Sequence, residues 1–469
     1  MFRHLTRLAV LCASFALLGG AMASAETPAT PAPNPTATPA AFQYGGTIRA
    51  YYFTRTNLVQ NAGNPNRTAF NFGGKLHGEY RFGDTPLTIG ASYYGADPFG
   101  ANGSNPGFNS KIDNTVPGFS LSTLGEAYVQ YKTKQLYVKV GNQNYKSPWA
   151  PDSDSRIKPA LYQGADVAIN FGSGWTLGLT DMIRFENRTS SAFEKTTLLT
   201  GGNIAGGPNN PRVETNGFGM ASLGYKYGSR FTATAYDYIF HDIANLFYAE
   251  GKYYPSPNSP LKPYVAAQYV DEHQAGRALS GLIDNNTYGM QVGASFSKNI
   301  DFALGFDEAP AHSATLFGSC SQAGASGYFV VAGGTPSCKS YAPGTYTVYY
   351  GGIASPYSDS YATDPLYTTS ISQGAADRHS PGVSFKLAGT FQTNDKKIKL
   401  ILSQAYYDYG NGAGINQTKE FDADATYFFN KVTPGTYRGL SLRHRYAERS
   451  QPTLPFDFKY NRTQLEYDF

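Results

Sequence analysis

Cysteine, tryptophan and long apolar runs are scarce in this chain, and their scarcity narrows the choice of fold. Three of the 469 residues are cysteine and two are tryptophan. Beyond the first 25 residues, no stretch approaches the ~20 apolar residues that a membrane-spanning helix needs. Long segments with apolar residues at i, i+3, i+4 and i+7 are also missing, which argues against a helical protein.

The one apolar run lies at the N-terminus and has the features of a secretory signal peptide. Arg3 and Arg7 precede an apolar core at 8–18, and Ala23-Ser24-Ala25 supplies a cleavage site. Residues 1–25 are therefore predicted to be removed on export. Residues 26–41 are rich in Pro, Ala and Thr, have nothing to bury, and are predicted to form a disordered leader.

The mature chain is close to neutral and shows no motif for metal binding or catalysis. Removal of residues 1–25 leaves 36 of the 38 Lys and Arg residues against 34 Asp and Glu, so nucleic acid is not an expected partner. The seven histidines show no H-x-x-x-H or H-E-x-x-H spacing, and no metal or other cofactor is predicted. No G-x-S-x-G elbow is present, so an enzyme is not expected.

Tyrosine, phenylalanine and glycine are abundant, at 37, 30 and 51 residues. Short alternating runs bounded by Gly, Pro, Asn or Asp recur along the chain, as in strands and hairpins. They predict 18 strands, at about 42–55, 68–82, 86–94, 122–133, 134–143, 161–171, 174–187, 214–228, 229–240, 244–254, 260–270, 285–297, 299–308, 380–393, 396–409, 420–431, 435–447 and 457–469.

Short and long connections alternate between these strands. Links such as 83–85 and 133–134 are short, whereas 95–121, 144–160, 188–213 and 309–379 are long. An even number of antiparallel strands with long loops at one end only is the layout of an outer-membrane barrel. The predicted fold is therefore an all-β transmembrane antiparallel β-barrel over residues 42–469, with short periplasmic turns and long extracellular loops, in a bacterial outer membrane.

The last residues support a membrane strand. Leu465, Tyr467 and Phe469 share one face, while the residues between them are polar or charged. Aromatic residues at a strand end lie at the bilayer interface. In bacterial outer-membrane proteins such a strand is also recognised by the barrel-insertion machinery, so this machinery and membrane lipid are expected partners.

Alternation also separates the lipid face from the lumen, because a charge facing lipid near the midplane costs ~2–4 kcal/mol. It places Glu126, Tyr128 and Lys139 in the lumen. Four arginines on the first strand and the last two strands also face inward, and we call them the arginine column: Arg49, Arg443, Arg445 and Arg462.

Barrel closure makes the first and last strands neighbours, so the column lies on three adjacent strands. It would attract anionic groups such as carboxylates. The alternative is that these arginines are ordinary solvated residues of the lumen wall.

The connection at 144–163 carries three prolines and charges of both signs. This composition suits a loop that folds inward and narrows the pore, and we call it the constriction loop. An ordinary exposed loop is the alternative. The charged residues of the constriction loop that are candidates for binding the solute are Asp152, Asp154, Arg156 and Lys158.

Three runs, LGEAYVQYK (124–132), VGNQNYKSPWAPDSDSRIKPALYQGADV (140–167) and YRGLSLRHRYAER (437–449), resemble the OprD family of substrate-specific outer-membrane porins. The resemblance implies a monomeric barrel through which small carboxylate-bearing solutes, such as amino acids, peptides and organic acids, diffuse along a basic ladder. It also implies that Arg156 and Lys158 lie at or near the constriction. Asp152 and Asp154 would hold the loop or form its acidic side, and the arginine column would be the ladder.

The connection at 309–379 contains Cys320 and Cys338. In an exported protein these two residues are predicted to form a disulfide, with two free thiols as the alternative. In the family this loop can fold over or into the channel, so the disulfide would hold a lid that restricts solute size.

A non-specific or oligosaccharide-selective porin is the alternative function. Tyr51, Tyr128 and Tyr137 could form an aromatic track for sugar rings. Sugar channels use stacked aromatic residues, whereas carboxylate channels use paired charges, so mutation of the arginine column distinguishes the two.

Overall fold

The computed structural model describes residues 41–56, 67–102, 120–152, 156–199, 213–279, 283–318, 344–358, 363–374, 382–408, 417–429, 439–451 and 457–469. The predicted signal peptide and nearly all of the predicted leader lie outside these ranges and stay predictions. Within the ranges, no helix is long and apolar enough to cross a membrane.

Period-2 alternation gives the described chain its strands. Their bounds are β1 (Phe42–Thr56), β2 (Arg67–Arg81), β3 (Leu87–Asp97), β4 (Leu121–Lys132), β5 (Leu136–Gln143), β6 (Leu161–Gly172), β7 (Trp175–Glu186), β8 (Phe218–Tyr227), β9 (Phe231–Phe240), β10 (Ala244–Tyr253), β11 (Tyr264–Gln274), β12 (Asp284–Ser297), β13 (Ile300–Ala309), β14 (His312–Gly318), β15 (Gly344–Tyr350), β16 (Gly382–Gln392), β17 (Ile398–Asp408), β18 (Gln417–Phe428), β19 (Gly439–Ser450) and β20 (Phe458–Asp468).

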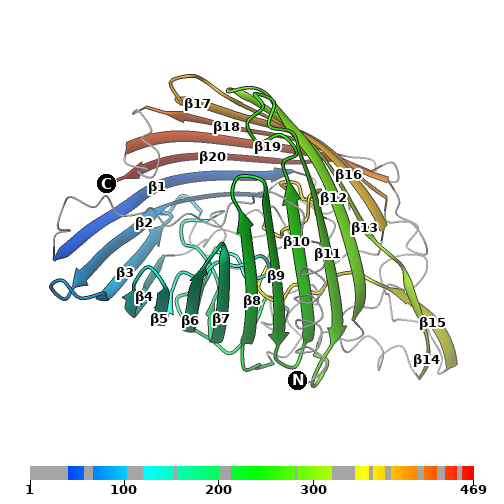
Figure 1. The fold of residues 1–469 in the computed structure, drawn as a ribbon, viewed down its shortest axis with the longest axis horizontal. Coiled ribbons are helices and arrows are strands. Elements are labelled where there is room, and N and C mark those ends of the chain that lie inside the picture. Colours follow the sequence, from blue (N-terminus) through cyan, green and yellow to red (C-terminus); the bar gives the residue numbers. More distant parts are fainter. Residues whose placement is uncertain are drawn as a thin grey trace.

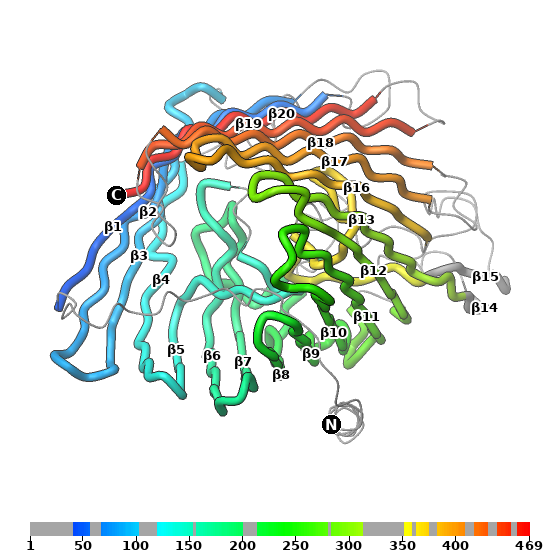
Figure 2. The backbone as a smooth tube through the Cα atoms, turned by 45° about the horizontal axis from the view of Figure 1, so that its top comes forward, coloured from blue at the N-terminus to red at the C-terminus, as the bar shows by residue number. Residues whose placement is uncertain are grey.

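An 18-stranded antiparallel sheet closes on itself and forms the barrel. Each strand pairs with its neighbour in sequence, except that β13 pairs with β16, and β20 returns to pair with β1. Figures 1 and 2 show this wall running from blue β1 through the green strands to red β20, beside β1 again. The predicted fold is confirmed, and each predicted strand overlaps one strand of the barrel.

The strands β14 and β15 were not predicted. They form a separate two-stranded sheet within the long connection after β13. Figure 1 shows this hairpin projecting beyond the barrel wall. Cys320 and Cys338 lie between its strands but outside the described residues, so the disulfide and the lid that it would hold stay predictions.

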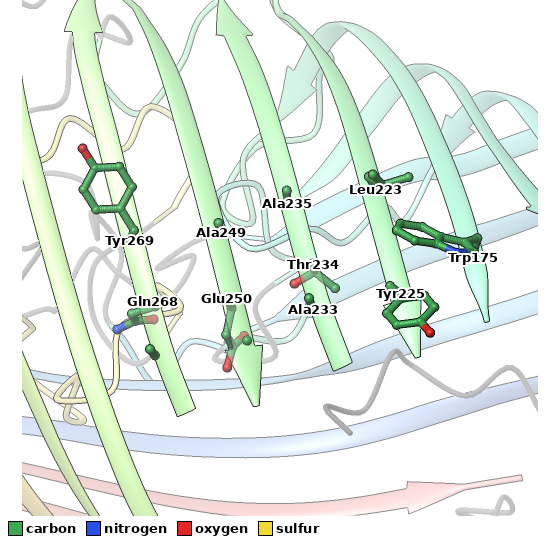
Figure 3. Close-up of a pocket in the computed structure, with 12 residues that line it drawn as sticks. Trp175, Leu223, Tyr225, Ala233, Thr234, Ala235, Ala249, Glu250, Gln268 and Tyr269 are labelled. Carbon is green, nitrogen blue, oxygen red and sulfur yellow. The ribbon is translucent and has the colours of Figure 1, made fainter. Parts of the chain in front are cut away.

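The outer face of the wall is apolar, and part of it is hollowed where its side chains are small. Ala233, Ala235, Ala249, Gly251 and Ala267 lie in register on β9, β10 and β11. Large side chains bound this hollow, which Figure 3 shows from outside, and they include Trp175, Tyr225 and Tyr269. Because the lining is almost wholly apolar, the hollow suits hydrocarbon rather than a polar solute.

The lumen side of β6 to β10 carries an aromatic core. Tyr145 and Trp149 of the constriction loop and Tyr357 of the connection after β15 enter this core. Tyr357 lies 5.0 Å from Phe218 between ring centroids, and Phe218 lies 5.9 Å from Phe240. These contacts fix two loops against one side of the barrel.

Candidate functional site

The arginine column begins on β19, where two arginines share one carboxylate. Arg443 donates through Nε and Nη2 to the two oxygens of Asp424 on β18, at 2.8 and 2.7 Å. Arg445 donates through Nε to Asp424 Oδ2 at 2.5 Å. A bidentate contact fixes a guanidinium plane as well as its position. Asp424 therefore holds both arginines along the lumen wall.

Arg462 on β20 lies directly across from Arg445 in the register of the two strands. It is only 1% exposed. Its guanidinium carbon lies 5.3 Å from the ring centre of Tyr51, and Nη1 donates to the Tyr51 hydroxyl at 3.4 Å. Cation–π contact and burial therefore position this arginine on the seam between β20 and β1.

Arg49 completes the column on β1 and connects it to the constriction loop. Its Nε donates to Glu466 Oε2 on β20 at 2.5 Å. Its Nη1 donates to the backbone carbonyl of Arg156. The column thus lies on adjacent strands, as predicted from closure, and touches a loop that enters the lumen.

Arg156 and Lys158 are both buried, Lys158 to 1% exposure. Lys158 Nζ lies 3.1 Å from Glu186 Oε1 and donates to the Asn187 carbonyl at 2.9 Å. Burial lowers the pKa of Lys158 to about 8, although Glu186 opposes this shift. Lys158 therefore ties the constriction loop to the end of β7.

The structure describes one of the two acidic candidates of the constriction loop, Asp152. Asp152 Oδ1 lies 3.5 Å from Lys146 Nζ, and the Asp152 carbonyl accepts a bond from Ala160 N at 2.9 Å. Asp152 thus contacts residues at both ends of the loop. Asp154 lies outside the described residues, so its role stays a prediction.

Arg188, which follows β7, is a charged residue of the lumen that sequence reasoning missed. It is buried, and burial followed by repulsion from Arg156 lowers its pKa well below the usual value, while Tyr51 opposes the shift. Arg156, Arg188 and Arg462 therefore gather near Tyr51. A single arginine in a long connection gives no periodic signal that could have revealed it.

Residues 363–374, which we call the strap, run along the lumen side of the neighbouring strands β13, β16, β17 and β18. The backbone N and Oγ1 of Thr368 donate to Asp307 Oδ2 at 2.8 and 2.7 Å. The backbone N and Oγ of Ser372 donate to the two oxygens of Glu420 at 2.6 and 2.8 Å. Arg449 Nη1 donates to the Ser372 carbonyl at 3.1 Å. Acidic lumen residues, which sequence reasoning did not single out, anchor this segment.

The strap and the constriction loop meet at the arginine column. Ile371 of the strap packs against a buried cluster that contains Ile157 of the constriction loop. The same cluster contains Tyr51 and Tyr460 from the seam strands. The strap and the constriction loop therefore pack together beside Tyr51, which contacts Arg462.

A second charged group lies around Glu126 on β4. A β-bulge between β3 and β4 turns Leu124 outward and Glu126 inward, although the two residues are two apart. Glu126 accepts a bond from the Tyr94 hydroxyl at 2.7 Å, and Lys75 and Lys139 lie 3.8 and 3.9 Å from its oxygens. Glu126 and Lys139 thus face the lumen together.

Two of the three tyrosines that suggested an aromatic track are buried and contact cations. Lys139 Nζ lies 3.8 Å from the ring centre of Tyr128, which is buried. Tyr51 is buried beneath Arg462. Across the described part of the chain, no group of three or more His, Cys, Asp or Glu residues could hold a metal ion.

A family model described as "outer membrane porin, OprD family" matches residues 44–326, more than half of the chain. The chain belongs to the OprD family. It is therefore a porin of the bacterial outer membrane, and members of this family are channels rather than enzymes. A comparison with curated proteins gives no match.

Solved structures of other OprD-family porins share the fold. The OccK9 (OpdG) porin of Pseudomonas aeruginosa has a TM-score of 0.66 and 15% identity, over 91% of this chain and 98% of its own. OpdK of the same organism, crystallised with vanillate, has a TM-score of 0.66 and 14% identity, over the same shares of the two chains. OccK2 (OpdF), in complex with glucuronate, has a TM-score of 0.65 and 15% identity, again over the same shares of the two chains.

Proposed function

We propose that this porin lets small carboxylate-bearing solutes, such as amino acids, peptides and organic acids, diffuse passively along the arginine column. The observation that carries the proposal is the set of inward arginines on adjacent strands, which meets the constriction loop where Arg49 donates to the Arg156 carbonyl. Guanidinium groups bind carboxylates in a planar, bidentate manner. A solute can therefore exchange its carboxylate from one arginine to the next.

The narrow region lies where the strap and the constriction loop approach the column. Ile157 and Ile371 pack there beside Tyr51. In our proposal Arg156 contributes to the constriction, while Lys158 acts as an anchor through Glu186 rather than as a solute ligand. Asp424 serves the channel by holding Arg443 and Arg445.

Two findings favour a carboxylate over a neutral sugar. Tyr51 and Tyr128 are buried and contact cations, so their rings do not offer an open stacking surface. The likeness to porins crystallised with vanillate and with glucuronate, both carboxylates, supports the same class of solute.

Single-channel recording in planar bilayers tests the proposal. We expect the native channel to prefer anions in a salt gradient. An Arg443→Gln/Arg445→Gln double variant should lose that preference or prefer cations, because Asp424 then faces the lumen without its two arginines. The matched control is His444→Gln, which lies between them on the outer face of β19 beside Thr463.

The His444→Gln channel should keep the native reversal potential. Equal anion preference in the double variant and the native protein would show that the arginines are only wall residues. Current block by maltose oligosaccharides in that case would favour the sugar-selective alternative.

A further inference from the structure

A polar hollow of about 240 Å³ lies beside the seam of the barrel, at the end that carries the short turns. It is lined by residues at the start of β1, by inward residues of β2 and by Phe469, and we call it the exit pocket. Its lining comprises Gln43, Tyr44, Gly45, Gly46, Thr47, Lys75, His77, Glu79 and Phe469.

A glycine contributes to the space between the inward residues. Gly45 lies directly across from His77 in the register of β1 and β2, and it has no side chain to fill the gap. A Cβ atom at Gly46 would approach the Phe469 ring to 2.8 Å, so this ring covers Gly46 on the outer face and borders the hollow at the seam. The pocket is thus defined by the seam and not by a loop.

The polar groups of the pocket form an ordered array. Lys75, His77 and Glu79 occupy successive inward positions of β2, and alternate residues of a strand are about 7 Å apart. Gln43 lies across from Glu79 on β1. The Lys75 side chain is 33% exposed, so its ammonium group can still meet a solute although it lies 3.8 Å from Glu126.

The neighbouring contacts leave hydrogen-bonding capacity on this array. Glu79 accepts one bond, from the Tyr128 hydroxyl at 3.0 Å, and a carboxylate can accept several. His77 contacts Ser92 Oγ through Nδ1 at 2.8 Å, which leaves its Nε2 for other partners.

We propose that the exit pocket is a second binding station, selective for carboxylates that also carry hydroxyl groups. The carboxylate binds Lys75, and the hydroxyl groups bind Glu79, His77 and Gln43. This inference rests on the proposed function, because it adds a station for solutes that leave the arginine column. A carboxylate with a plain hydrocarbon chain would leave Glu79 and Gln43 without hydrogen bonds from the solute, so it binds more weakly.

Two six-carbon monocarboxylates distinguish binding in the exit pocket from binding at the arginine column. Gluconate carries hydroxyl groups and hexanoate carries none, while both have one carboxylate. Solute-induced current interruptions are recorded in planar bilayers with native protein and with the variants Lys75→Gln and Gln43→Leu. Gln43 is exposed near the start of β1, so we expect Gln43→Leu to fold. This variant therefore still tests the pocket if Lys75→Gln fails to fold.

The matched control is Lys399→Gln, which removes a lysine from the second position of β17 at the same end of the barrel. We expect gluconate dwell times to fall roughly three- to tenfold in Lys75→Gln and in Gln43→Leu. Hexanoate dwell times should change much less in Gln43→Leu, and Lys399→Gln should match the native protein for both solutes.

The exit pocket is refuted if Gln43→Leu changes neither solute, or changes both equally. This failure is distinct from failure of the arginine column. If Arg443→Gln/Arg445→Gln abolishes anion preference while the pocket variants leave gluconate dwell times unchanged, only the second station is wrong. If the arginine variant is unchanged, the column itself is wrong.

Discussion

Lys158 illustrates how burial can turn a charged residue into an anchor. Its ammonium group lies 3.1 Å from Glu186, and burial lowers its pKa to about 8. In the unfolded chain a lysine keeps a pKa of about 10.4. Between these values the unfolded chain binds more protons than the folded chain, so the free energy of unfolding rises with pH.

We therefore predict that the native barrel gains stability as the pH rises from about 8 to about 10, through Lys158. The stability should be measured by urea unfolding in detergent at pH 7.5 and 9.5, for the native protein and Lys158→Met. Other groups titrate in this range, so the difference between the two proteins is the relevant quantity. An identical pH dependence in both proteins would contradict the assigned burial.

The strap is an element that we expect to limit the width of the pore. Glu420 accepts the backbone N and the hydroxyl of Ser372, and both bonds are buried. Removal of these acceptors leaves buried donors without partners, at a cost of about 1–3 kcal/mol each. Glu420→Ala should therefore release this end of the strap and give a larger, noisier single-channel conductance.

The control for this experiment is Glu448→Ala, which removes an acid from the outer face of β19, where it contacts Lys459. Its conductance should equal that of the native channel. An unchanged conductance in Glu420→Ala would mean that the strap is held by its other contacts, such as Thr368 with Asp307.

The elements differ in how far the sequence alone predicts them. The strands are predictable because period-2 alternation is a local property, and the constriction loop has a local concentration of prolines and charges. The strap is not predictable, because Asp307 and Glu420 are single acids on β13 and β18, and only the folded sheet brings them to one segment. Arg188 also carries no local pattern, and its position depends on the folded loop.

At the scale of the whole molecule, closure depends on the seam between β1 and β20. Thr47 Oγ1 donates to Asp468 Oδ1 at 2.6 Å, and Arg49 donates to Glu466 one inward position further along. Their side chains face the lumen, so these pairs add polar complementarity to the backbone ladder. The residues that set the register of closure therefore include one member of the arginine column.

A charge exchange across the seam tests this double role. Arg49→Glu places two carboxylates opposite each other, and Glu466→Arg places two guanidinium groups there. Each change should slow or reduce refolding into lipid vesicles, because a hydrogen-bonded charge pair of about 1.5–3 kcal/mol is replaced by repulsion. The double variant should refold as well as the native chain, as judged by the heat-modifiable band on a gel.

The double variant also separates assembly from transport. Arg49 donates to the Arg156 carbonyl, and a glutamate at position 49 cannot make that bond. We therefore expect the double variant to close its barrel yet to show a weaker anion preference than the native channel. If it refolds no better than either single variant, the pair does not set the register. If it keeps the full anion preference, Arg49 serves closure alone, and the arginine column that guides solutes consists of Arg443, Arg445 and Arg462.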